Sequence, residues 1–471
     1  MTHNKCCFIL SLFFYTVSIA AVEDNYDDPA YLSGIGLPVM TIETVNGETP
    51  TYRVAPKRYE GAIGNSITDA NKVPGSITIT FKGDTVYQSG EYVEDISGMT
   101  IRVRGNTSPL VSDKKPFKIK LEKKADLLFR DNDSIYKDKN WILIRDESLK
   151  NMVGFKLNEL LGMEWTPAFK YVNVIFNGKY QGLYMLLESV RRNETARINV
   201  DKTGYIFEFD PYWWNEDLFV KSGLTYLDWL PMHYTFKYPK AEEMTPAELD
   251  YFTKMIDTVE ESLYDGTYPK YIDVESFARW MLGHDILGNS DGAGSNIYLS
   301  KYDNTDNSKV RMSTLWDLEG SMRRSEAWDE IHTLGVFYFH YLFDNKNDEF
   351  EETYEKIWEN EGEAIFKGIE SFIHEFETSD QISALGESIL IDNDRWDTEN
   401  ESVEECVELF KDWFTNRMPW LVKNIGPVKS AIRGVTNQQE TRENDYYNLT
   451  GQKVQTPRKG IYIVKGKKVI L

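Results

Sequence analysis

The chain of 471 residues has few of the side chains that bind soft metals or form cross-links, with three cysteines and six histidines. Cys6 and Cys7 lie at the very start, which leaves Cys406 alone in the rest of the chain. A disulfide framework is therefore excluded for the body of the protein. The His and Cys residues show no ligand spacing, which argues against a zinc centre. Cys406 lies in an acidic, helix-like stretch, which predicts a partly buried small side chain and not a nucleophile.

Basic residues are also scarce, since 75 Asp and Glu face 53 Lys and Arg for a formal charge of −22. This surplus argues against a nucleic-acid backbone or an anionic bilayer as the main partner. There is no collagen-type period, no heptad array and no solenoid-type repeat. The hydrophobic share is 41%, with 24 Phe, 28 Tyr and 12 Trp, which is enough for a large buried core.

The start of the chain predicts an export signal. Lys5 is followed by a mostly apolar run over residues 6–21, and an acidic stretch comes next. This is the pattern of a secretory signal peptide cleaved after Ala20 or Ala21, although a retained anchor is the alternative. The run is shorter than the roughly 20 apolar residues of a spanning helix. The mature chain is thus predicted to lack a membrane span and to be secreted to the periplasm, the outer surface or the medium.

The end of the chain is basic, in contrast to the acidic body. Short β-prone runs at 461–464 and 468–471 flank a Lys-Gly-Lys turn, and a Gln- and Asn-rich stretch precedes them. Residues 431–471 are therefore predicted to be a linker and a small C-terminal β module. The module resembles the C-terminal β modules of secreted Bacteroidota proteins, some of which act as sorting signals. A terminal hairpin packed on the body is the alternative.

The body predicts a mixed α+β fold. Residues 22–98 are polar and β-prone, which predicts a β-rich N-terminal extension. In the strand after it, Phe117, Ile119 and Leu121 share one face while Lys118 and Lys120 share the other. The second half is mostly helical by its pattern. Helices are expected at 149–161 (with Ser148 as N-cap), 245–263, 273–287, 349–376 and 401–424, and an Asn-Gly hairpin at 171–187. A β-rich lobe followed by a helical lobe predicts a two-lobed plan with a cleft.

Polar residues gather where glycines interrupt the chain between a predicted helix and a predicted strand. Asp291 and Asn296 are separated by four residues, which is the Asp-to-Asn spacing of a kinase catalytic loop. Asp317 follows at the end of a strand, where its carboxylate is suited to hold Mg²⁺ between phosphate oxygens. Turn-forming residues also produce such a pair by chance. The kinase-like interpretation of this pair therefore depends on the order of the motifs that surround it.

Taken together, these motifs resemble the CotH kinase family, which is named for a spore-coat protein. The matching segments occur in family order and cover about residues 99–325; they are 104–108, 114–120, 139–143, 180–188, 289–291, 295–299 and 316–319. The resemblance implies an atypical protein-kinase-like, two-lobed fold for residues 99–430. It also implies transfer of the ATP γ-phosphate, with Mg²⁺ or Mn²⁺, to a hydroxyl of a secreted or surface protein.

The resemblance implies specific roles for the acidic site. Asp291 would be the catalytic acid that activates the acceptor hydroxyl. Asn296 and Asp317 would be metal ligands. Glu319 stands where family members often have a second Asp, so a second carboxylate ligand would be longer.

For the nucleotide, the resemblance implies that Lys118 neutralises the α- and β-phosphates, with Lys120 as a second candidate. Arg104, which precedes a loop with a single glycine, belongs to the same nucleotide-binding set. Glu188 matches the family's acid near the adenine. The alternatives are a solvated strand face for the lysines and an exposed strand terminus for Glu188. No acidic partner for Lys118 is obvious on the following helix, where Glu159 is the candidate.

Three functional hypotheses result. The first is an active secreted kinase. The second is a catalytically inactive cell-surface adhesin or scaffold on the same fold, because ATP is scarce outside the cytoplasm. The third is glycan handling, in which the aromatic residues at 212–214 would stack on sugars, although such clusters also form cores.

Overall fold

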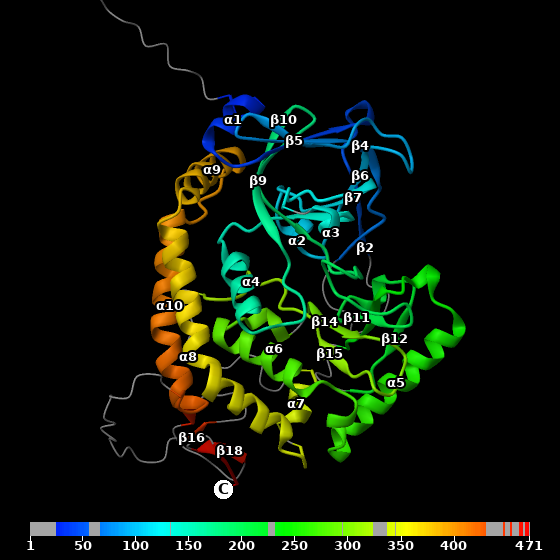
Figure 1. Ribbon diagram of the computed structural model, residues 1–471, viewed down its shortest axis with the longest axis vertical. Helices are drawn as coiled ribbons and strands as arrows, with labels where there is room; N and C mark the ends of the chain where they lie inside the picture. The colour runs from blue at the N-terminus through cyan, green and yellow to red at the C-terminus, as the bar shows by residue number, and fades with distance from the viewer. Residues whose placement is uncertain are drawn as a thin grey trace, which may run out of the picture.

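The computed structural model describes residues 25–55, 66–131, 133–224, 231–293, 295–323, 337–343 and 345–429, and four short strands between 446 and 470. The predicted signal peptide, residues 1–21, lies outside the described residues. The described chain is a mixed α+β structure with a β-rich N-terminal region and a helical C-terminal part (Figure 1). None of the described helices combines the length and the apolar character needed to cross a bilayer.

The N-terminal region is an eight-stranded sheet in the order β1-β9-β10-β8-β7-β6-β4-β5. Strand β1 also pairs with β4, so seven of the strands close into a barrel. The strands are β1 (Val39–Thr44), β4 (Val73–Phe81), β5 (Asp84–Gln88), β6 (Met99–Val103), β7 (Phe117–Ala125), β8 (Asp138–Ile144), β9 (Phe169–Phe176) and β10 (Lys179–Glu188). Because β1, β4 and β5 belong to this sheet, the predicted N-terminal extension is continuous with the strands that follow it. That segment also holds the short helix α1 (Pro29–Ile35) and the small pair β2 (Arg53–Ala55) and β3 (Ser66–Thr68).

The alternation predicted for β7 is confirmed. Ile119 is buried in the barrel core with Ile101 and Trp141, whereas Lys118 is partly exposed and Lys120 is exposed on the outer face. Successive residues of a strand point to opposite faces, so an apolar interior forces the intervening lysines outward. The outer face of β6 and β7 therefore carries positive charge.

The C-terminal part contains a second sheet that the sequence pattern did not reveal. Its order is β12-β13-β11-β14-β15, with β11 (Tyr205–Asp210), β12 (Phe219–Lys221), β13 (His233–Tyr238), β14 (Ile297–Lys301) and β15 (Val310–Met312). The strand at 297–299 was expected, but no secondary structure was predicted for residues 205–238, which supply β11, β12 and β13. Strand β11 is buried along its whole length, so its charged residues are not on a solvent face and the usual alternation is lost.

The expected helices are present. They are α4 (Lys150–Leu160), α5 (Pro246–Asp265), α6 (Val274–Leu287), α8 (Glu349–Glu377) and α10 (Val403–Asn424). Helix α9 (Gln381–Trp396) and the one-turn helices α2 (Ser108–Val111), α3 (Asp133–Tyr136) and α7 (Phe339–Leu342) were not predicted. The long helices α8 and α10 run side by side along one flank of the molecule (Figure 1).

The C-terminal block forms the predicted hairpin, β18 (Ile461–Val464) with β19 (Lys467–Ile470). Two shorter strands, β16 (Tyr446–Tyr447) and β17 (Lys453–Val454), complete a four-stranded sheet. Whether this sheet acts as a sorting signal stays a prediction.

A buried ion pair joins α9 to the barrel. Lys114 Nζ lies 2.7 Å from the carboxylate of Asp392, and their side chains are 2% and 5% exposed. Asp392 also accepts a hydrogen bond from the backbone N–H of Leu183 at 2.9 Å. We expect Asp392→Ala to lower the free energy of unfolding by about 3 kcal/mol, because it leaves the buried Lys114 charge with only the longer contact to Glu147, at 3.9 Å. Urea denaturation monitored by fluorescence measures this loss.

The matched control is Asp394→Ala, since Asp394 lies on the same helix with an exposed side chain. Its effect should stay within about 0.5 kcal/mol. A double variant, Lys114→Met with Asp392→Leu, should recover much of the stability, because it removes both charges together. Equal stability of Asp392→Ala and Asp394→Ala would contradict the role of the ion pair.

Candidate functional site

Helix α6 delivers the segment that carries Asp291. The helix ends at Gly288, whose φ of 57° is the left-handed conformation that glycine adopts without strain. Near this end, Tyr354 of α8 donates a hydrogen bond to Asp285 Oδ2 at 3.0 Å. Asp291 then lies in a 3-10 turn over 290–293, and its side chain is exposed. The buried helix end therefore holds an exposed carboxylate in a fixed place.

Helix α4 positions the loop that carries Asp317. Asn151 Oδ1 accepts a hydrogen bond from the backbone N–H of Leu318 at 3.0 Å. Asn158 Oδ1 accepts one from the backbone N–H of Leu315 at 2.7 Å. A Cβ added to Gly154 would lie 2.0 Å from Leu318 Cδ1, so only glycine lets the helix come this close. Two asparagines on one helix face thus fix the backbone on both sides of Asp317.

The structure brings Asp291, Asn296 and Asp317 together. Asn296 Nδ2 donates a hydrogen bond to Asp317 Oδ2 at 3.2 Å. Both residues adopt left-handed backbone conformations, with φ of 62° and 55°, which Asn and Asp tolerate better than most residues. Asp291 contacts the same loop, because a Cβ on Gly320 would lie 2.7 Å from Asp291 Oδ2. Three of the predicted site residues therefore form one polar cluster.

The cluster is electrostatically poised for a cation. The side chain of Asp317 is open to solvent, yet the surrounding protein desolvates its carboxylate, and this effect raises its pKa. Repulsion from Asp291 raises the pKa further, while Arg104 and the hydrogen bond from Asn296 oppose the shift. A positive charge between Asp317 and Asp291 would relieve this repulsion.

Asn289 links the two loops and was given no role from the sequence. Its Oδ1 accepts a hydrogen bond from the backbone N–H of Asp291 at 3.2 Å, and its Nδ2 donates to the carbonyl of Asp317 at 3.5 Å. The same Nδ2 lies 3.2 Å from His284 Nδ1, and burial lowers the pKa of His284 to about 3, so the ring is neutral and accepts this bond. In the sequence, the one sign of this linking role of Asn289 was its position directly after Gly288, the glycine that ends the helix.

Glu319 is held apart from Asp317. Its carboxylate accepts hydrogen bonds from Ser148 Oγ at 2.7 Å and from Asn151 Nδ2 at 3.0 Å, and it also contacts Asp146. Burial and the neighbouring Asp146 carboxylate raise its pKa well above the ordinary value. To act as a second metal ligand, Glu319 would have to leave these partners. The predicted N-cap role of Ser148 is wrong, because Leu149 occupies the cap and the Ser148 hydroxyl is used by Glu319.

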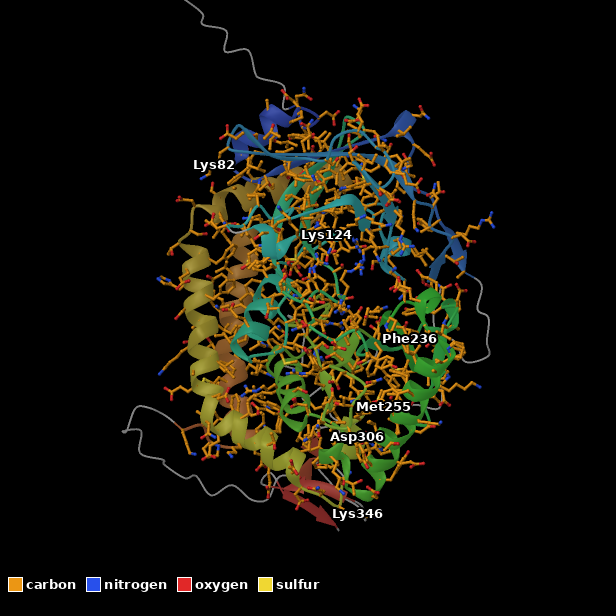
Figure 2. The ribbon with its side chains drawn as sticks, turned by 45° about the vertical axis from the view of Figure 1, so that its right-hand side comes forward. Lys82, Lys124, Phe236, Met255, Asp306 and Lys346 are labelled. Carbon is orange, nitrogen blue, oxygen red and sulfur yellow. The ribbon has the colours of Figure 1, made fainter. Side chains whose placement is uncertain are left out.

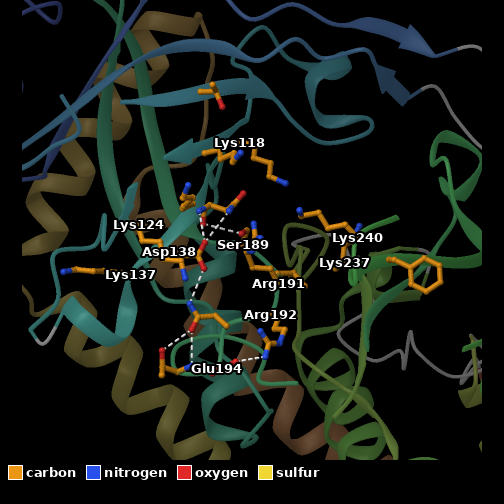
Figure 3. Close-up of a pocket in the computed structure, with 18 of the residues that line it drawn as sticks. Lys118, Lys124, Lys137, Asp138, Ser189, Arg191, Arg192, Glu194, Lys237 and Lys240 are labelled. Atoms are coloured by element: carbon orange, nitrogen blue, oxygen red, sulfur yellow. Dashed lines mark hydrogen bonds and ion pairs between the residues drawn. The ribbon is translucent and has the colours of Figure 1, made fainter. Parts of the chain in front are cut away.

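A large cationic pocket lies on the outer face of the barrel, with a volume of about 1120 Å³. Eleven lysines and arginines line it, against four Asp and Glu, in a chain whose net charge is −22. Figure 3 shows that Lys118 and Lys124 of β7 enter it together with Arg191 and Lys240, which come from two other segments. Such a concentration of positive charge would attract an anionic ligand.

Lys118 and Lys120 line this pocket, as does Arg102, which pairs with Lys118 across β6 and β7. Burial and the neighbouring cations, Arg102 first among them, lower the pKa of Lys118 to about 7. Arg104 adjoins both parts of the site, because its charge acts on Lys118 and on Asp317. Arg104 therefore links the charges of the pocket to those of the acidic cluster, which consists of Asp291, Asn296 and Asp317. In the sequence, the alternation of Arg102 with Arg104 was the signal that Arg102 lies on the same face of its strand as the predicted site residue Arg104.

Glu188 lies apart from this pocket. It pairs in register with Trp141, whereas Lys118 pairs with Ile142, so the two side chains leave opposite faces of the sheet. Glu188 is buried, forms an ion pair with Arg130 at 2.9 Å and accepts a hydrogen bond from Trp165 Nε1 at 3.3 Å. The alternative of an exposed strand terminus is therefore wrong, and the carboxylate is used inside the protein.

Three further sequence interpretations are settled by burial. Glu159 is exposed and pairs with Lys156 at 3.1 Å, so its candidacy as the partner of Lys118 is wrong. Trp213 and Trp214 are 5% and 1% exposed, so neither ring is available to stack on a sugar, and only Tyr212 of this segment is partly exposed. Cys406 is fully buried and free, and burial raises its pKa to about 12, so it is not a nucleophile.

The acidic cluster fits a magnesium or manganese ion that arrives with a phosphate ligand. Within the described part of the chain, no three His, Cys, Asp or Glu side chains converge closely enough to hold a metal by themselves. Mg²⁺ does not need such a cage, because it is commonly held by one or two carboxylates, substrate phosphates and water. Asp317 can supply the carboxylate, and Asn296 can supply an amide oxygen after rotation of its side-chain amide.

Comparison with known proteins agrees with this geometry. No curated protein sequence matches the chain. Residues 101–421, about two thirds of the 471 residues, match the sequence model of the CotH kinase protein family. The matched region contains the cationic strands, helix α4 and both acidic loops. The chain therefore belongs to the CotH kinase family.

Proposed function

We propose that the protein is a phosphotransferase that moves the γ-phosphate of ATP to a hydroxyl of a protein acceptor, with Mg²⁺ or Mn²⁺. The barrel would serve as the N-lobe of a two-lobed, kinase-like arrangement, and α5 to α10 would form most of the C-lobe. The observation that supports this most strongly is the meeting of Asp291, Asn296 and Asp317 beside a cationic pocket. Phosphoryl transfer depends on positioning and on neutralising charge, and this arrangement offers both.

Each residue has a chemical task in this proposal. Asp291 accepts the proton of the acceptor hydroxyl, for which an exposed carboxylate beside the metal ligands is suited. Asp317 and Asn296 hold the divalent cation, which neutralises charge on the phosphates. Arg104 and Lys118 bind phosphate oxygens from the opposite side. The buried Asn289 keeps Asp291 and Asp317 at a fixed separation.

The proposal includes export, since the N-terminal segment has the pattern of a signal peptide and the C-terminal sheet resembles sorting modules of Bacteroidota proteins. The acceptor would then be a secreted or surface protein. The competing function is that of an inactive adhesin or scaffold on the same fold. The first experiment must separate these two.

Calorimetric titration of residues 22–471 with ATP and Mg²⁺ or Mn²⁺ makes this separation. We expect saturable binding that a chelator abolishes. An absence of heat with every nucleotide and metal would refute the phosphotransferase and favour the adhesin. Thermal unfolding followed in parallel would show a cooperative transition if the protein is folded. A bound ligand would raise the melting temperature of that transition.

Lys118 makes nucleotide binding depend on pH. Its pKa of about 7 in the free protein rises when phosphates supply negative charge, so binding takes up a proton above pH of about 7. We expect the affinity to be constant below this pH and to fall by up to about tenfold per pH unit above it. Calorimetry in two buffers with different ionisation enthalpies measures the proton uptake directly.

The control for this prediction is Lys118→Met, which should bind more weakly and lose both the slope and the proton uptake. In the free protein, Lys118 binds fewer protons than in the unfolded chain between pH values of about 7 and 10.5. Its charge therefore costs stability at pH 7 and below, and the cost fades as the pH rises to 10.5. Lys118→Met should accordingly be harder to unfold in urea at neutral pH. An unchanged pH slope in this variant would contradict the assignment.

A further inference from the structure

The cationic pocket is larger and more charged than a nucleoside triphosphate requires. Its volume of about 1120 Å³ exceeds the roughly 300–1,000 Å³ of ordinary ligand pockets. Such pockets are lined mainly by apolar side chains, with few polar groups. Here the apolar side chains are few, and cations continue through the whole cavity. A purine base is uncharged, so it does not account for positive charge at both ends.

The register of the strands shows how far this charge extends. Arg104 does not line the pocket, but its charge acts both on Lys118, which does, and on Asp317 of the acidic cluster, so it marks the side of the pocket nearest that cluster. On the paired strand, Lys120 lies level with Thr100, four residues from Arg104 along the chain and roughly 13 Å away at the rise of a β-strand. Lys124 lies four residues further along β7 and still lines the pocket. Three phosphoryl groups in a row cover only the first part of this path.

The cations at the far end are available to a ligand. Lys124 and Lys139 line the pocket there, and neither forms an ion pair with a carboxylate of the described residues. By contrast, Lys237 and Lys240 on the other wall are paired with Glu208 and Glu243 at 2.7 and 2.8 Å. The distal lysines lie on the side of the donor's leaving group, because the acceptor must approach from Asp291.

We propose that this pocket binds linear inorganic polyphosphate as a phosphoryl donor, with its terminal phosphate at Asp317 and its chain along β6 and β7 toward Lys124. The inference rests on the proposed phosphoryl transfer. ATP occupies only the inner part of the same path. A donor of this class also suits an exported enzyme, for which ATP is scarce.

The transfer balances without another reactant. The acceptor hydroxyl oxygen forms a bond to the terminal phosphorus, and the bond from that phosphorus to the bridging oxygen breaks. The proton passes to Asp291, and the chain leaves one phosphate shorter. When water is the acceptor, the product is inorganic phosphate.

The test compares how polyphosphates of different lengths bind to the protein of residues 22–471. Titrations use tripolyphosphate, a size-fractionated medium-length polyphosphate and ATP, each with Mg²⁺. We expect the medium chain to bind at least about tenfold more tightly than tripolyphosphate, because it reaches further cations, and to compete with ATP. We also expect slow, metal-dependent release of inorganic phosphate from the medium chain, which Asp317→Asn abolishes.

The deciding variant is Lys124→Gln with Lys139→Gln. It should bring the affinity for the medium chain down to that for tripolyphosphate and change ATP affinity by less than about threefold. The matched control is Lys82→Gln with Lys346→Gln, which removes the same charge from two exposed lysines distant from Lys124 (Figure 2). This control variant should behave like the parent protein.

Several outcomes would overturn the inference. Equal affinity for short and medium chains would do so, as would equal loss in both double variants. Equally tight binding of a sulfated polysaccharide would show a general polyanion surface. Binding without phosphate release would show a ligand and not a donor. If ATP binds in a metal-dependent manner while polyphosphate does not, the proposed function stands and only this inference fails.

Discussion

Asp317→Asn should reduce metal-dependent nucleotide binding by about a hundredfold or more, because it removes the carboxylate that faces the cation site. The substitution is suited to the position, since Asp317 has a φ of 55° and Asn tolerates that conformation. The fold should therefore remain intact. Calorimetry with ATP and Mn²⁺ measures the loss, and circular dichroism verifies the fold.

Asp306→Asn is the matched control, because Asp306 is an exposed carboxylate in the loop between β14 and β15. It should leave nucleotide affinity unchanged. Equal affinity in the parent protein and Asp317→Asn would show that the metal is held elsewhere. Glu319 is the less suitable candidate for such a role, since its carboxylate is bound to Ser148 and Asn151.

Asp291→Asn should separate chemistry from binding. Loss of the group that accepts the hydroxyl proton should lower the rate of phosphoryl transfer by about 10²–10⁴-fold. Nucleotide affinity should be largely retained, because the proposal assigns the metal to Asp317 and Asn296 and the phosphates to Arg104 and Lys118. Transfer is measured by labelling of an acceptor or release of labelled phosphate under saturating nucleotide.

Two results would contradict this role for Asp291. Transfer at the parental rate would show that the hydroxyl proton leaves by another route. A parallel loss of nucleotide affinity would place Asp291 among the binding residues instead. Asp303→Asn, in the loop after β14, provides a second carboxylate control outside the acidic cluster.

The contrast between Lys118 and Glu188 shows where sequence patterns inform the site. Lys118 follows from alternation, since an apolar face on β7 dictates that the lysines point outward. Glu188 belongs to an equally clear motif, but its direction depends on the register of β8 with β10. That register is set by barrel closure, which a local pattern does not encode.

Helices and strands differ in the same way. The amphipathic helices α5, α8 and α10 were predictable, because their apolar residues recur every three or four positions, and capping boxes mark the starts of α5 and α10. Strand β11 was missed, because it is buried on both faces and its carboxylates are neutralised by partners from other strands, as Glu208 is by Lys237. Burial of that kind becomes visible only when the second sheet is assembled.

The sequence by itself determined the family, the trio of Asp291, Asn296 and Asp317, and the cationic face of β7, since spacing and alternation are local properties. The tertiary structure decided which acids face the site. It buried Glu188, tied Glu319 to Asn151 and placed Asn289 between the two loops. It also gathered lysines from distant segments into one pocket. Like charges repel one another, so only the packing of the folded chain holds them together.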